Sequence, residues 1–326
     1  MTYQNILVLG GTGFVGQCLV DRLVARGCRV RVPTRRWAHA RELQVLPTIE
    51  IVPADINDPA TLRRLVAGCD TVVNLVGVLH GGGSGSQGVG FGKGFAQAHV
   101  ELPRSLVAAC REQGVKRLLH VSAMGADTKG PSGYLRSKGE GERIVQNAPG
   151  LLTTVFRPSV VFGPRDNFLN LFARLATLLP VLFIGGANSR MQPVAVQDLA
   201  DAMCNALDLP AAFSRTYEIC GPAIYTLREL VQFAARASGH PRPVVGLPDI
   251  LARIMAGAFE ILPGPTLLSR DNLRSLSVDC VASTQPYRPA PELGLHLSPM
   301  EPEATLFLAG IHPRTRFSGF RARAGR

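Results

Sequence analysis

The chain has 326 residues, of which 46% are hydrophobic and 18% charged, and this composition excludes a disordered protein and supports a sizeable core. Its net charge of +11 comes almost entirely from 31 Arg against 4 Lys, which favours anionic ligands, acidic membrane surfaces or acidic protein partners. Nucleic acid is not an expected partner, because aromatic residues make up only 6% and no basic run alternates with stacking side chains.

The seven cysteines are at least ten residues apart, and the histidines lack metal-ligand spacing. This scatter indicates reduced thiols in a cytosol-like compartment and no bound metal. No signal peptide is expected, since a predicted strand begins near Gln4, and no apolar run is long enough for a transmembrane segment. The predicted location is the cytoplasm of a bacterial-type cell, with peripheral contact at the inner membrane left open.

Short apolar runs and helical periodicities alternate through the first half of the chain. Strands are predicted at residues 5–9, 28–32, 49–53, 71–76, 117–121 and 152–156, and helices at 14–26, 62–67, 95–113 and 134–148. This alternation predicts an α/β fold, a Rossmann-type doubly wound parallel sheet with a smaller irregular C-terminal lobe. The predicted domains are residues 1–157, the dinucleotide-binding domain, residues 158–310, a smaller lobe for substrate or partner interleaved with the first, and residues 311–326, a basic tail.

The pattern loosens in the predicted second lobe, where short strands at residues 191–196 and 216–219 accompany helices at 198–207 and 227–238. Residues 248–262 carry an apolar stripe at helical spacing, and such stripes are more often core than membrane contact. The last sixteen residues hold five Arg and no acid, which is typical of a solvated tail or an electrostatic contact.

The strongest local signal is the glycine-rich segment Gly10-Gly11-Thr12-Gly13-Phe14-Val15-Gly16, which joins the first strand to the first helix. Gly10 allows a tight turn, Gly13 lets the backbone approach a pyrophosphate, and Gly16 lets the helix pack on the strand. The N–H groups and the positive end of the helix dipole then face the anion. The alternative, a glycine turn without a ligand, is disfavoured by the strand and helix on either side.

The end of the second strand selects the cofactor in such folds. An acidic residue there would bind the ribose 2′-hydroxyl of NAD, but this sequence has Thr34, Arg35 and Arg36. A guanidinium can hold a 2′-phosphate through two hydrogen bonds and stack on adenine. The sequence therefore predicts NADP(H), with NAD(H) as the less favoured alternative. The competing interpretation is a pair of solvated surface arginines.

Two further strand ends complete the predicted cofactor site. Asp55 and Ile56 follow the third strand, where the carboxylate could accept from the adenine amino group while Asp58 caps the next helix. Leu75, Val76 and Gly77 end the fourth strand and would wall the adenine and its ribose.

Three residues around the fifth strand have the spacing of a proton-transfer site. Ser122 ends that strand, and Tyr134 and Lys138 lie four apart on one face of the following helix. A lysine ammonium near a phenol lowers the pKa of the phenol, so Tyr134 could exchange a proton near neutral pH. Ser122 could donate a hydrogen bond to a substrate carbonyl. A Tyr-x-x-x-Lys match alone is common by chance, but its place after strand five makes it specific.

Together these motifs and Arg157-Pro-Ser-Val-Val-Phe-Gly-Pro164 resemble the short-chain dehydrogenase/reductase superfamily, in its extended or atypical branch, over roughly residues 4–240. Further segments are similar to the accessory NADPH-binding subunit family of respiratory complex I and its bacterial relatives. These are Asn74–Gly77, His99–Glu101, His120–Gly125, Gln192–Ala200 and Leu267–Asp279.

The resemblance implies a tightly held NADPH in a family whose members often lack demonstrated turnover. It also implies that Pro158 and Val160 lie along the nicotinamide. His99 stands where the extended enzymes usually have an Asn that supports the proton relay behind the lysine, so a buried, hydrogen-bonded structural role is expected for it.

Two hypotheses follow for the function. The first is an NADP(H)-dependent oxidoreductase acting on a small carbonyl, alcohol or quinone-like substrate. The second is a non-catalytic NADPH-binding accessory subunit or assembly factor of a respiratory, complex I-like membrane complex. Eight glycines in residues 81–94 form either a flexible loop or a lid over the cofactor, and the sequence favours neither.

Overall fold

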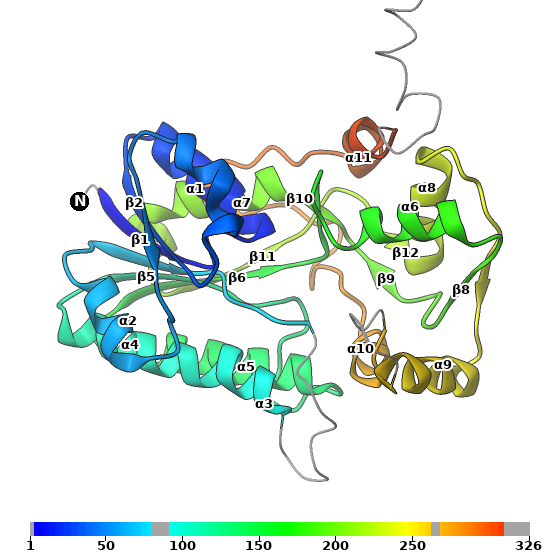
Figure 1. Cartoon of the computed structure of the whole chain (residues 1–326), viewed down its shortest axis with the longest axis horizontal. Coiled ribbons are helices and arrows are strands. Elements are labelled where there is room, and N and C mark those ends of the chain that lie inside the picture. Colours follow the sequence, from blue (N-terminus) through cyan, green and yellow to red (C-terminus); the bar gives the residue numbers. More distant parts are fainter. Residues whose placement is uncertain (1–2, 80–90, 262–267, 310–326) are drawn as a thin grey trace, which may run out of the picture. The chain divides into compact units, whose positions relative to one another are not determined.

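The computed structural model of the protein describes residues 3–79, 91–261 and 268–309. The chain forms two compact units (Figure 1). The first unit comprises Met1–Pro158, Gln197–Ile219 and Arg288–His296. The second comprises Ser159–Val196, Cys220–Tyr287 and Leu297–Arg326.

The first unit is built on a sheet of seven parallel strands in the spatial order β11-β6-β5-β4-β1-β2-β3. The strands are β1 (Asn5–Leu9), β2 (Arg29–Thr34), β3 (Ile49–Pro53), β4 (Thr71–Asn74), β5 (Arg117–Val121), β6 (Leu152–Pro158) and β11 (Arg215–Ile219). The chain leaves β1 toward β2 and β3 on one side and returns to β4 on the other, which is the topology of a doubly wound fold. The predicted fold class is confirmed.

Helices cover both faces of this sheet (Figure 1). On one face lie α1 (Phe14–Ala25) and α7 (Val196–Leu207), which are joined by an ion pair of 2.7 Å between Arg22 and Asp201. The other face carries α2 (Pro59–Val66), α4 (Leu102–Glu112) and α5 (Gly133–Gln146). The unit also contains the short helices η1 (Trp37–Val45), η3 (Pro210–Ala212) and η4 (Pro291–Leu293). The central strands β1 and β4 are mostly apolar because both of their faces are buried.

The single helix predicted over residues 95–113 is divided into three consecutive pieces. These are α3 (Lys93–Phe95), the π-helical segment η2 (Ala96–Glu101) and α4. Pro103, in the first turn of α4, has no N–H to donate to the preceding turn, so the regular α-helical hydrogen bonding cannot run through this point. Such π segments are frequent at functional sites, and η2 carries His99.

β11 belongs to the sheet although its residues had been assigned to the smaller lobe. Residues 216–219 and the helix at 198–207 both return to the first unit. β11 pairs in parallel with β6, and Tyr217 stacks on its neighbour Phe156 with ring centroids 6.2 Å apart. The alternation of apolar and polar residues in a short strand shows which side chains share a face, but it does not show which strand lies beside it. The sequence therefore did not predict that β11 pairs with β6.

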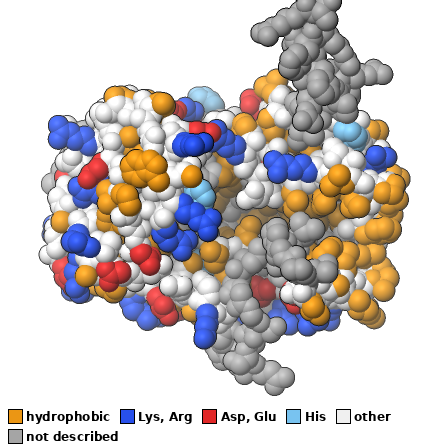
Figure 2. Space-filling view, in the orientation of Figure 1, with side chains coloured by type: hydrophobic (Ala, Val, Ile, Leu, Met, Phe, Trp, Pro, Cys, Tyr) orange, Lys and Arg blue, Asp and Glu red, His pale blue; other side chains and the backbone are white. Residues whose placement is uncertain are grey.

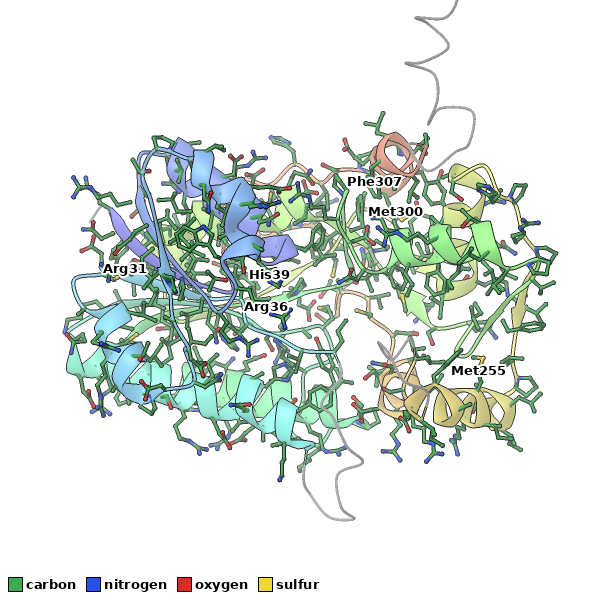
Figure 3. The ribbon with its side chains drawn as sticks, in the orientation of Figure 1. Arg31, Arg36, His39, Met255, Met300 and Phe307 are labelled. Atoms are coloured by element: carbon green, nitrogen blue, oxygen red, sulfur yellow. The ribbon has the colours of Figure 1, made fainter. Side chains whose placement is uncertain are left out.

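The second unit is less regular. Its described elements are β7 (Val161–Phe162), α6 (Leu169–Leu178), β8 (Leu182–Ile184), β9 (Arg190–Met191), β10 (Val194–Ala195), β12 (Tyr225–Thr226), α8 (Leu227–Ala237), β13 (Val244–Gly246), α9 (Asp249–Ile261), α10 (Arg270–Ser275) and α11 (Met300–Leu308). Its core gathers buried side chains of α6, α8 and α11, including Leu230 and Met300, with Phe307 packed against them (Figure 3).

One expectation for this unit is wrong. The apolar stripe of residues 248–262 is predicted to face the core, but in α9 Ile250, Leu251, Ile254 and Ile261 are exposed, and Met255 and Phe259 are only half-buried. The buried side of the helix is formed by small residues, including Ala252 and Ala256. Helical periodicity identifies an apolar face without showing whether it is covered.

Within the described ranges, no helix has both the length and the apolar character that a membrane crossing needs. In the same ranges, no cluster of His, Cys, Asp or Glu side chains is placed to hold a metal ion. All seven cysteines are free thiols.

A buried arginine joins the sheet to α7. Arg117 is 0% exposed, and its guanidinium donates to backbone carbonyls and one hydroxyl at 2.7–3.1 Å. The acceptors are Leu152 O, Thr154 Oγ1, Ala206 O and Leu207 O. Burial lowers the pKa of Arg117 to about 10, so it stays cationic at neutral pH. The C-terminal carbonyls of α7 stabilise this charge through the helix dipole.

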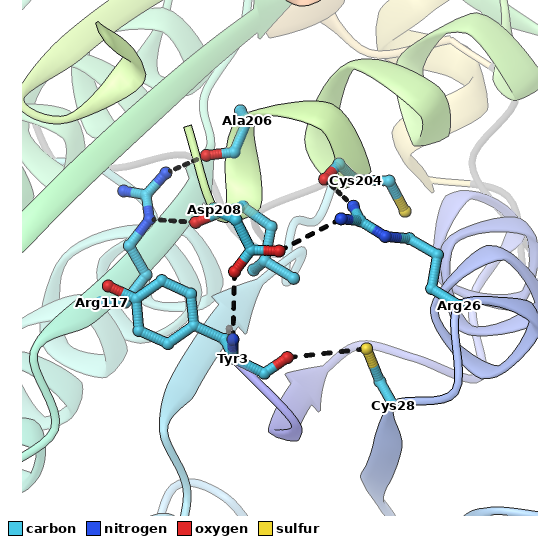
Figure 4. A network of polar contacts seen from close by, with 8 residues as sticks. Tyr3, Arg26, Cys28, Arg117, Cys204, Ala206 and Asp208 are labelled. Carbon is cyan, nitrogen blue, oxygen red and sulfur yellow. Dashed lines mark hydrogen bonds and ion pairs between the residues drawn. The ribbon is translucent and has the colours of Figure 1, made fainter. Parts of the chain in front are cut away.

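A second set of contacts beside Arg117 fixes the start of the chain (Figure 4). Asp208, just after α7, accepts from the backbone N–H of Tyr3 at 3.0 Å and pairs with Arg26 at 3.1 Å. Arg26 also donates to the carbonyl of Cys204. These bonds join α1, α7 and the segment before β1 at the edge of the sheet where β1 begins.

We expect Arg117→Met to lower the free energy of unfolding by about 3 kcal/mol, because it leaves several buried acceptors without a donor. Arg143→Met is the control, since Arg143 pairs with Glu140 on an exposed helix face and its loss should change stability far less. Urea unfolding of both variants measures the difference. Equal losses would show that the Arg117 contacts carry no special weight.

Candidate functional site

The predicted cofactor residues gather at one edge of the sheet in the first unit. In a parallel sheet the carboxyl ends of all strands share one edge, and here these ends are Leu9, Thr34, Pro53, Asn74 and Val121. The strand order reverses between β1 and β4, and ligands of open α/β sheets bind at this kind of switch point. The fold therefore places the glycine segment at the centre of the edge.

Three positions after β1 are occupied by glycine for different structural reasons. Gly16 is required by packing, since a Cβ there would lie 2.2 Å from the carbonyl oxygen of Gly10. Gly10 has φ +81°, which side chains rarely adopt, and it contacts Leu75 after β4. Gly13 is exposed, and a Cβ there would meet only the Gly10 carbonyl oxygen, at 3.2 Å. Packing therefore leaves the Gly13 surface open to a ligand, as a pyrophosphate-binding loop requires.

The N-terminus of α1 has no side-chain cap. Gly13 is its N-cap residue, and Thr12, Phe14 and Val15 beside it are half-buried. By contrast, Asp58 caps α2 through the Thr61 N–H at 2.9 Å, as the sequence predicts. The first turn of α1 also contains no acid, so its backbone N–H groups can bind an anion.

Arg35 and Arg36 are exposed directly after β2. Thr34 is buried and fixes this turn, because its hydroxyl donates to the Arg36 carbonyl at 3.0 Å and accepts from the Arg36 N–H at 3.2 Å. Figure 3 shows Arg36 and His39 near each other at the start of η1. For neither arginine is an ion pair with a described carboxylate present.

Asp55 and Ile56 follow β3, where Ile56 is half-buried and Asp55 exposed. The Oδ1 atom of Asp55 accepts from the backbone and side-chain nitrogens of Asn57 at 3.1 and 2.8 Å. The carboxylate is thus oriented by its own turn. Its Oδ2 atom accepts no hydrogen bond from the described residues, which leaves one oxygen to accept from a ligand.

The segment after β4 lies between the glycine loop and α5. The N–H of Leu75 donates to Leu9 O at 3.0 Å, and the N–H of Val76 donates to Asn74 Oδ1 at 3.1 Å. At Gly77 a Cβ would lie 3.2 Å from the ammonium nitrogen of Lys138. Gly77 therefore leaves room for the lysine head group, a role that its position in the sequence did not reveal.

Lys138 and Ser122 are buried polar groups with unused hydrogen-bonding capacity. The Lys138 ammonium donates to the Val121 carbonyl at 3.1 Å, and burial lowers its pKa to about 8. An ammonium has three donors, and no second acceptor for it is found among the described residues. The hydroxyl of Ser122 is buried without any partner there. Buried polar atoms are normally paired, so these groups fit a bound polar ligand.

Tyr134 lies in the first turn of α5, one turn before Lys138, and is half-buried. Its ring meets His99 edge-on at 5.7 Å and Phe95 at 6.0 Å, while Phe95 stacks on His99 at 5.6 Å. This aromatic cluster holds the Tyr134 ring in place. The N-terminus of α5 is itself fixed by Ser132, whose hydroxyl accepts from the Leu135 N–H at 3.1 Å.

His99 is 2% exposed and fully hydrogen-bonded, as expected for a structural histidine. Its Nε2 accepts from the Val78 N–H at 3.1 Å, so the proton of the neutral ring is on Nδ1, which donates to Ser137 Oγ at 2.8 Å. Ser137 donates in turn to the Tyr134 carbonyl at 2.8 Å. Burial and the Lys138 charge lower the pKa of His99 to about 2.

A second buried histidine was not anticipated. Asn74 Oδ1 already accepts from Val76, so its Nδ2 donates to His120 Nδ1 at 3.1 Å and leaves the proton on Nε2. That Nε2 is buried without a partner among the described residues. Burial, and then the charge of Lys138, lower the pKa of His120 to about 3. Its alternating position in an apolar strand gave no sign of this arrangement.

A buried ion pair lies one turn beyond Lys138. Glu142 is 1% exposed, and Arg157 donates to its two oxygens at 2.7–3.1 Å. The carboxylate raises the pKa of Lys138, but less than burial lowers it. The net result is an ammonium that loses its proton more easily than an exposed lysine does.

The remaining predicted residues lie at or outside this edge. Pro158 ends β6, and its carbonyl accepts from the Met124 N–H at 3.0 Å. Val160 is in the second unit, where its carbonyl accepts from the Val194 N–H at 3.0 Å. Most of the glycine-rich segment 81–94, the proposed lid, lies outside the described residues, as does the basic tail 311–326.

The doubly wound sheet, the uncapped glycine turn and the buried lysine define a Rossmann-type protein that binds a nicotinamide dinucleotide. The chain belongs to the NAD dependent epimerase/dehydratase family, whose model matches residues 6–220.

Two curated relatives show the range of this family. NADH dehydrogenase (ubiquinone) 1 alpha subcomplex subunit 9, mitochondrial, of Arabidopsis thaliana is 30% identical over 85% of this chain and 70% of its own length. A ceramide reductase of Caulobacter vibrioides is 30% identical over 75% of this chain and 74% of its own. Among solved structures, an NADPH-dependent quinone oxidoreductase of Escherichia coli with NADPH superposes with a TM-score of 0.71 at 19% identity, covering 93% of this chain and 99% of that one. The last match speaks for the fold alone.

The two histidines should make the protein sensitive to mild acid. Their pKa lies near 6.5 when unfolded and near 2 and 3 when folded, so below pH 6.5 the unfolded chain binds more protons and stability falls. In His99→Asn, the stability difference from the wild type should shrink by about 1.4 kcal/mol for each pH unit below 6.5. Urea unfolding at several pH values measures it, and parallel wild-type and variant curves would refute a neutral buried His99.

Proposed function

We propose that the protein is an NADP(H)-dependent oxidoreductase that acts on a small carbonyl or alcohol or on a quinone-like substrate. The observation that carries this proposal is the presence of two buried polar groups at the ligand-binding edge of the sheet, the Lys138 ammonium with one hydrogen bond and the Ser122 hydroxyl with none from the described residues. A purely structural lysine would be expected to have its donors satisfied by the protein.

The described residues fit each part of the cofactor. Residues Gly10–Gly16 and the uncapped start of α1 would hold the pyrophosphate. Arg35 and Arg36 would hold the 2′-phosphate, Asp55 with Ile56 would contact the adenine, and Leu75–Gly77 would line the adenosine. The free donors of Lys138 would bind the nicotinamide ribose, beside Pro158. When bound, the nicotinamide supplies or accepts a hydride.

The chain supplies the proton and the orientation of the substrate. Tyr134 would exchange the proton at its phenol oxygen, since the Lys138 charge four residues away favours phenolate. Ser122 would donate its hydroxyl hydrogen to the substrate oxygen. The pKa of Lys138, lowered to about 8, is close enough to neutral pH for this lysine to take part in proton transfer.

The substrate class is the least specified part of this proposal. The name of a related ceramide reductase supports a substrate that the protein reduces. The chemistry is the same for a carbonyl and for a quinone, a hydride to one atom and a proton to an oxygen. The cytoplasm of a bacterial-type cell is the proposed location.

A second candidate function is an NADPH-holding accessory subunit or assembly factor of a respiratory, complex I-like membrane complex. It is favoured by His99, whose hydrogen bonds to Val78 and Ser137 fill both ring nitrogens and leave none for a proton relay behind Lys138. It is also supported by the similarity to a mitochondrial NADH dehydrogenase subunit. The cofactor would then stabilise the fold by mass action instead of turning over.

We expect NADPH to bind at least tenfold more tightly than NADH, because a charge-assisted phosphate contact contributes about 1.5–3 kcal/mol. Arg35→Ala should weaken NADPH binding and leave NADH binding nearly unchanged. Arg111→Ala, at the exposed end of α4, is the matched control. Calorimetry of the three proteins with both nucleotides measures these affinities, and equal affinities of the wild type for NADPH and NADH would refute the role of the arginines.

Tyr134→Phe separates the two candidate functions. In an oxidoreductase it should keep NADPH affinity and lower turnover by about 10²–10⁴-fold, the usual contribution of a positioned acid–base group. Lys138→Met should impair both, since it removes a ribose contact together with the charge. The measurements are NADPH oxidation with carbonyl and quinone substrates and the thermal shift with NADPH. Unchanged oxidation by Tyr134→Phe, with stability following NADPH occupancy, would favour the accessory subunit.

A further inference from the structure

The second unit exposes far more apolar surface than the first. Of the fourteen large hydrophobic side chains that are exposed within the described ranges, eleven lie in the second unit. The three in the first unit, Trp37, Val45 and Leu79, are scattered along its chain. Single exposed apolar residues need no explanation, but a concentration of them marks an interaction surface.

α9 is the main source of this surface. Ile250, Leu251, Ile254 and Ile261 are 73%, 51%, 64% and 85% exposed. The spacing of Ile250, Ile254 and Ile261 places them on one stripe of the helix. Met255 on the same helix is half-buried, and Figure 3 labels it on α9. A helix that buries alanine and glycine and exposes isoleucine has the reverse of the usual arrangement.

Close packing on the inner side of α9 excludes the reverse orientation. A Cβ at Gly185, after β8, would lie 2.9 Å from the Cβ of Ala252 and 2.6 Å from Leu273 of α10. A Cβ at Gly257 would lie 2.5 Å from the Arg270 guanidinium. Only small side chains therefore fit on this face. The large aliphatic residues are directed outward by the fold itself.

Neighbouring elements extend the apolar area. Phe183 of β8 and Val245 of β13 are cross-strand partners and are 55% and 41% exposed. Leu178 and Leu179, at the end of α6, precede β8 and are also exposed. Figure 2 shows hydrophobic side chains gathered over this part of the unit. These four residues and the four exposed residues of α9 are called the α9 surface below.

The composition of the α9 surface favours lipid over protein. Protein interfaces are enriched in aromatic residues, whereas Phe183 is the single aromatic member of this set. Arg253 of α9 and Arg274 of α10 are exposed on the two helices that border it. The backbone N–H of Arg270 donates a hydrogen bond to one carboxylate oxygen of Glu260, the acid nearest the end of α9. Aliphatic side chains with arginines around them are typical of helices that lie in a membrane interface.

The net positive charge of the chain favours lipids with anionic headgroups. The net charge is +11, and every basic residue of the second unit is an arginine. Arginine side chains are attracted to anionic headgroups.

We propose that the α9 surface binds the face of a bilayer that contains anionic phospholipids. The four α9 side chains would enter the boundary between headgroups and acyl chains, and the arginines would pair with lipid phosphates. The inference goes beyond the proposed function, since no residue of the dinucleotide site takes part in it. The contact is peripheral and rests on the second unit alone.

Flotation with vesicles tests the proposal on the full chain. The wild type should bind vesicles of phosphatidylcholine with about one third phosphatidylglycerol, and bind phosphatidylcholine alone more weakly. The triple variant Ile250→Ser/Ile254→Ser/Ile261→Ser should lose binding by at least about tenfold, because it removes most of the apolar area that would enter the bilayer. Val45→Ser, an equally exposed apolar residue of the first unit (82%), should bind as the wild type does.

Two further measurements on these variants test whether they fold and whether a second copy of the chain binds the α9 surface instead of lipid. NADPH affinity and melting temperature should stay at wild-type values in the triple variant, since the substituted side chains are exposed. Light scattering of wild type and variant gives the oligomeric state. A wild-type dimer that the triple variant converts to a monomer would overturn the proposal in favour of a second copy. Absent vesicle binding, or equal binding by both proteins, would overturn it as well.

Discussion

The site depends on one constraint, the burial of the Lys138 ammonium with a single hydrogen bond to the Val121 carbonyl. Burial lowers its pKa to about 8, and the charge that remains reaches its neighbours. It helps keep His99 and His120 neutral, and its nitrogen lies 3.2 Å from where a Cβ at position 77 would be. Glu142 offsets part of the cost, but its carboxylate is already held by Arg157. A change at Lys138 would therefore alter every group around it.

The hydrogen bonds of His99 limit the paths by which a proton could leave Lys138. Its two nitrogens are used by Val78 and Ser137, and the chain of hydrogen bonds ends on the Tyr134 carbonyl, which cannot pass a proton on. A proton leaving Lys138 would need another path. The groups that face the ligand, Ser122 and Lys138, are unaffected by this.

The sequence predicted what depends on local spacing. The parallel sheet, the glycine turn after β1 and the Asp58 cap all follow from residues close together in the chain. It did not predict the Asn74–His120 bond or the place of β11, because both depend on which strands are neighbours. It assigned the α9 stripe to the core, since periodicity reports a face but not its partner. The cofactor assignments at single residues remain predictions.

The unpaired atoms say more about function than the fold does. A superfold hosts many activities, so the sheet order cannot separate an enzyme from a cofactor-holding subunit. The buried Ser122 hydroxyl and the His120 Nε2 have no partner in the described chain, and each such atom destabilises the free protein by about 1–3 kcal/mol. A ligand that pairs with even one of them gains affinity because the protein is already arranged for it. Both candidate functions place the cofactor at this edge of the sheet, so a partner for these atoms is expected in either case.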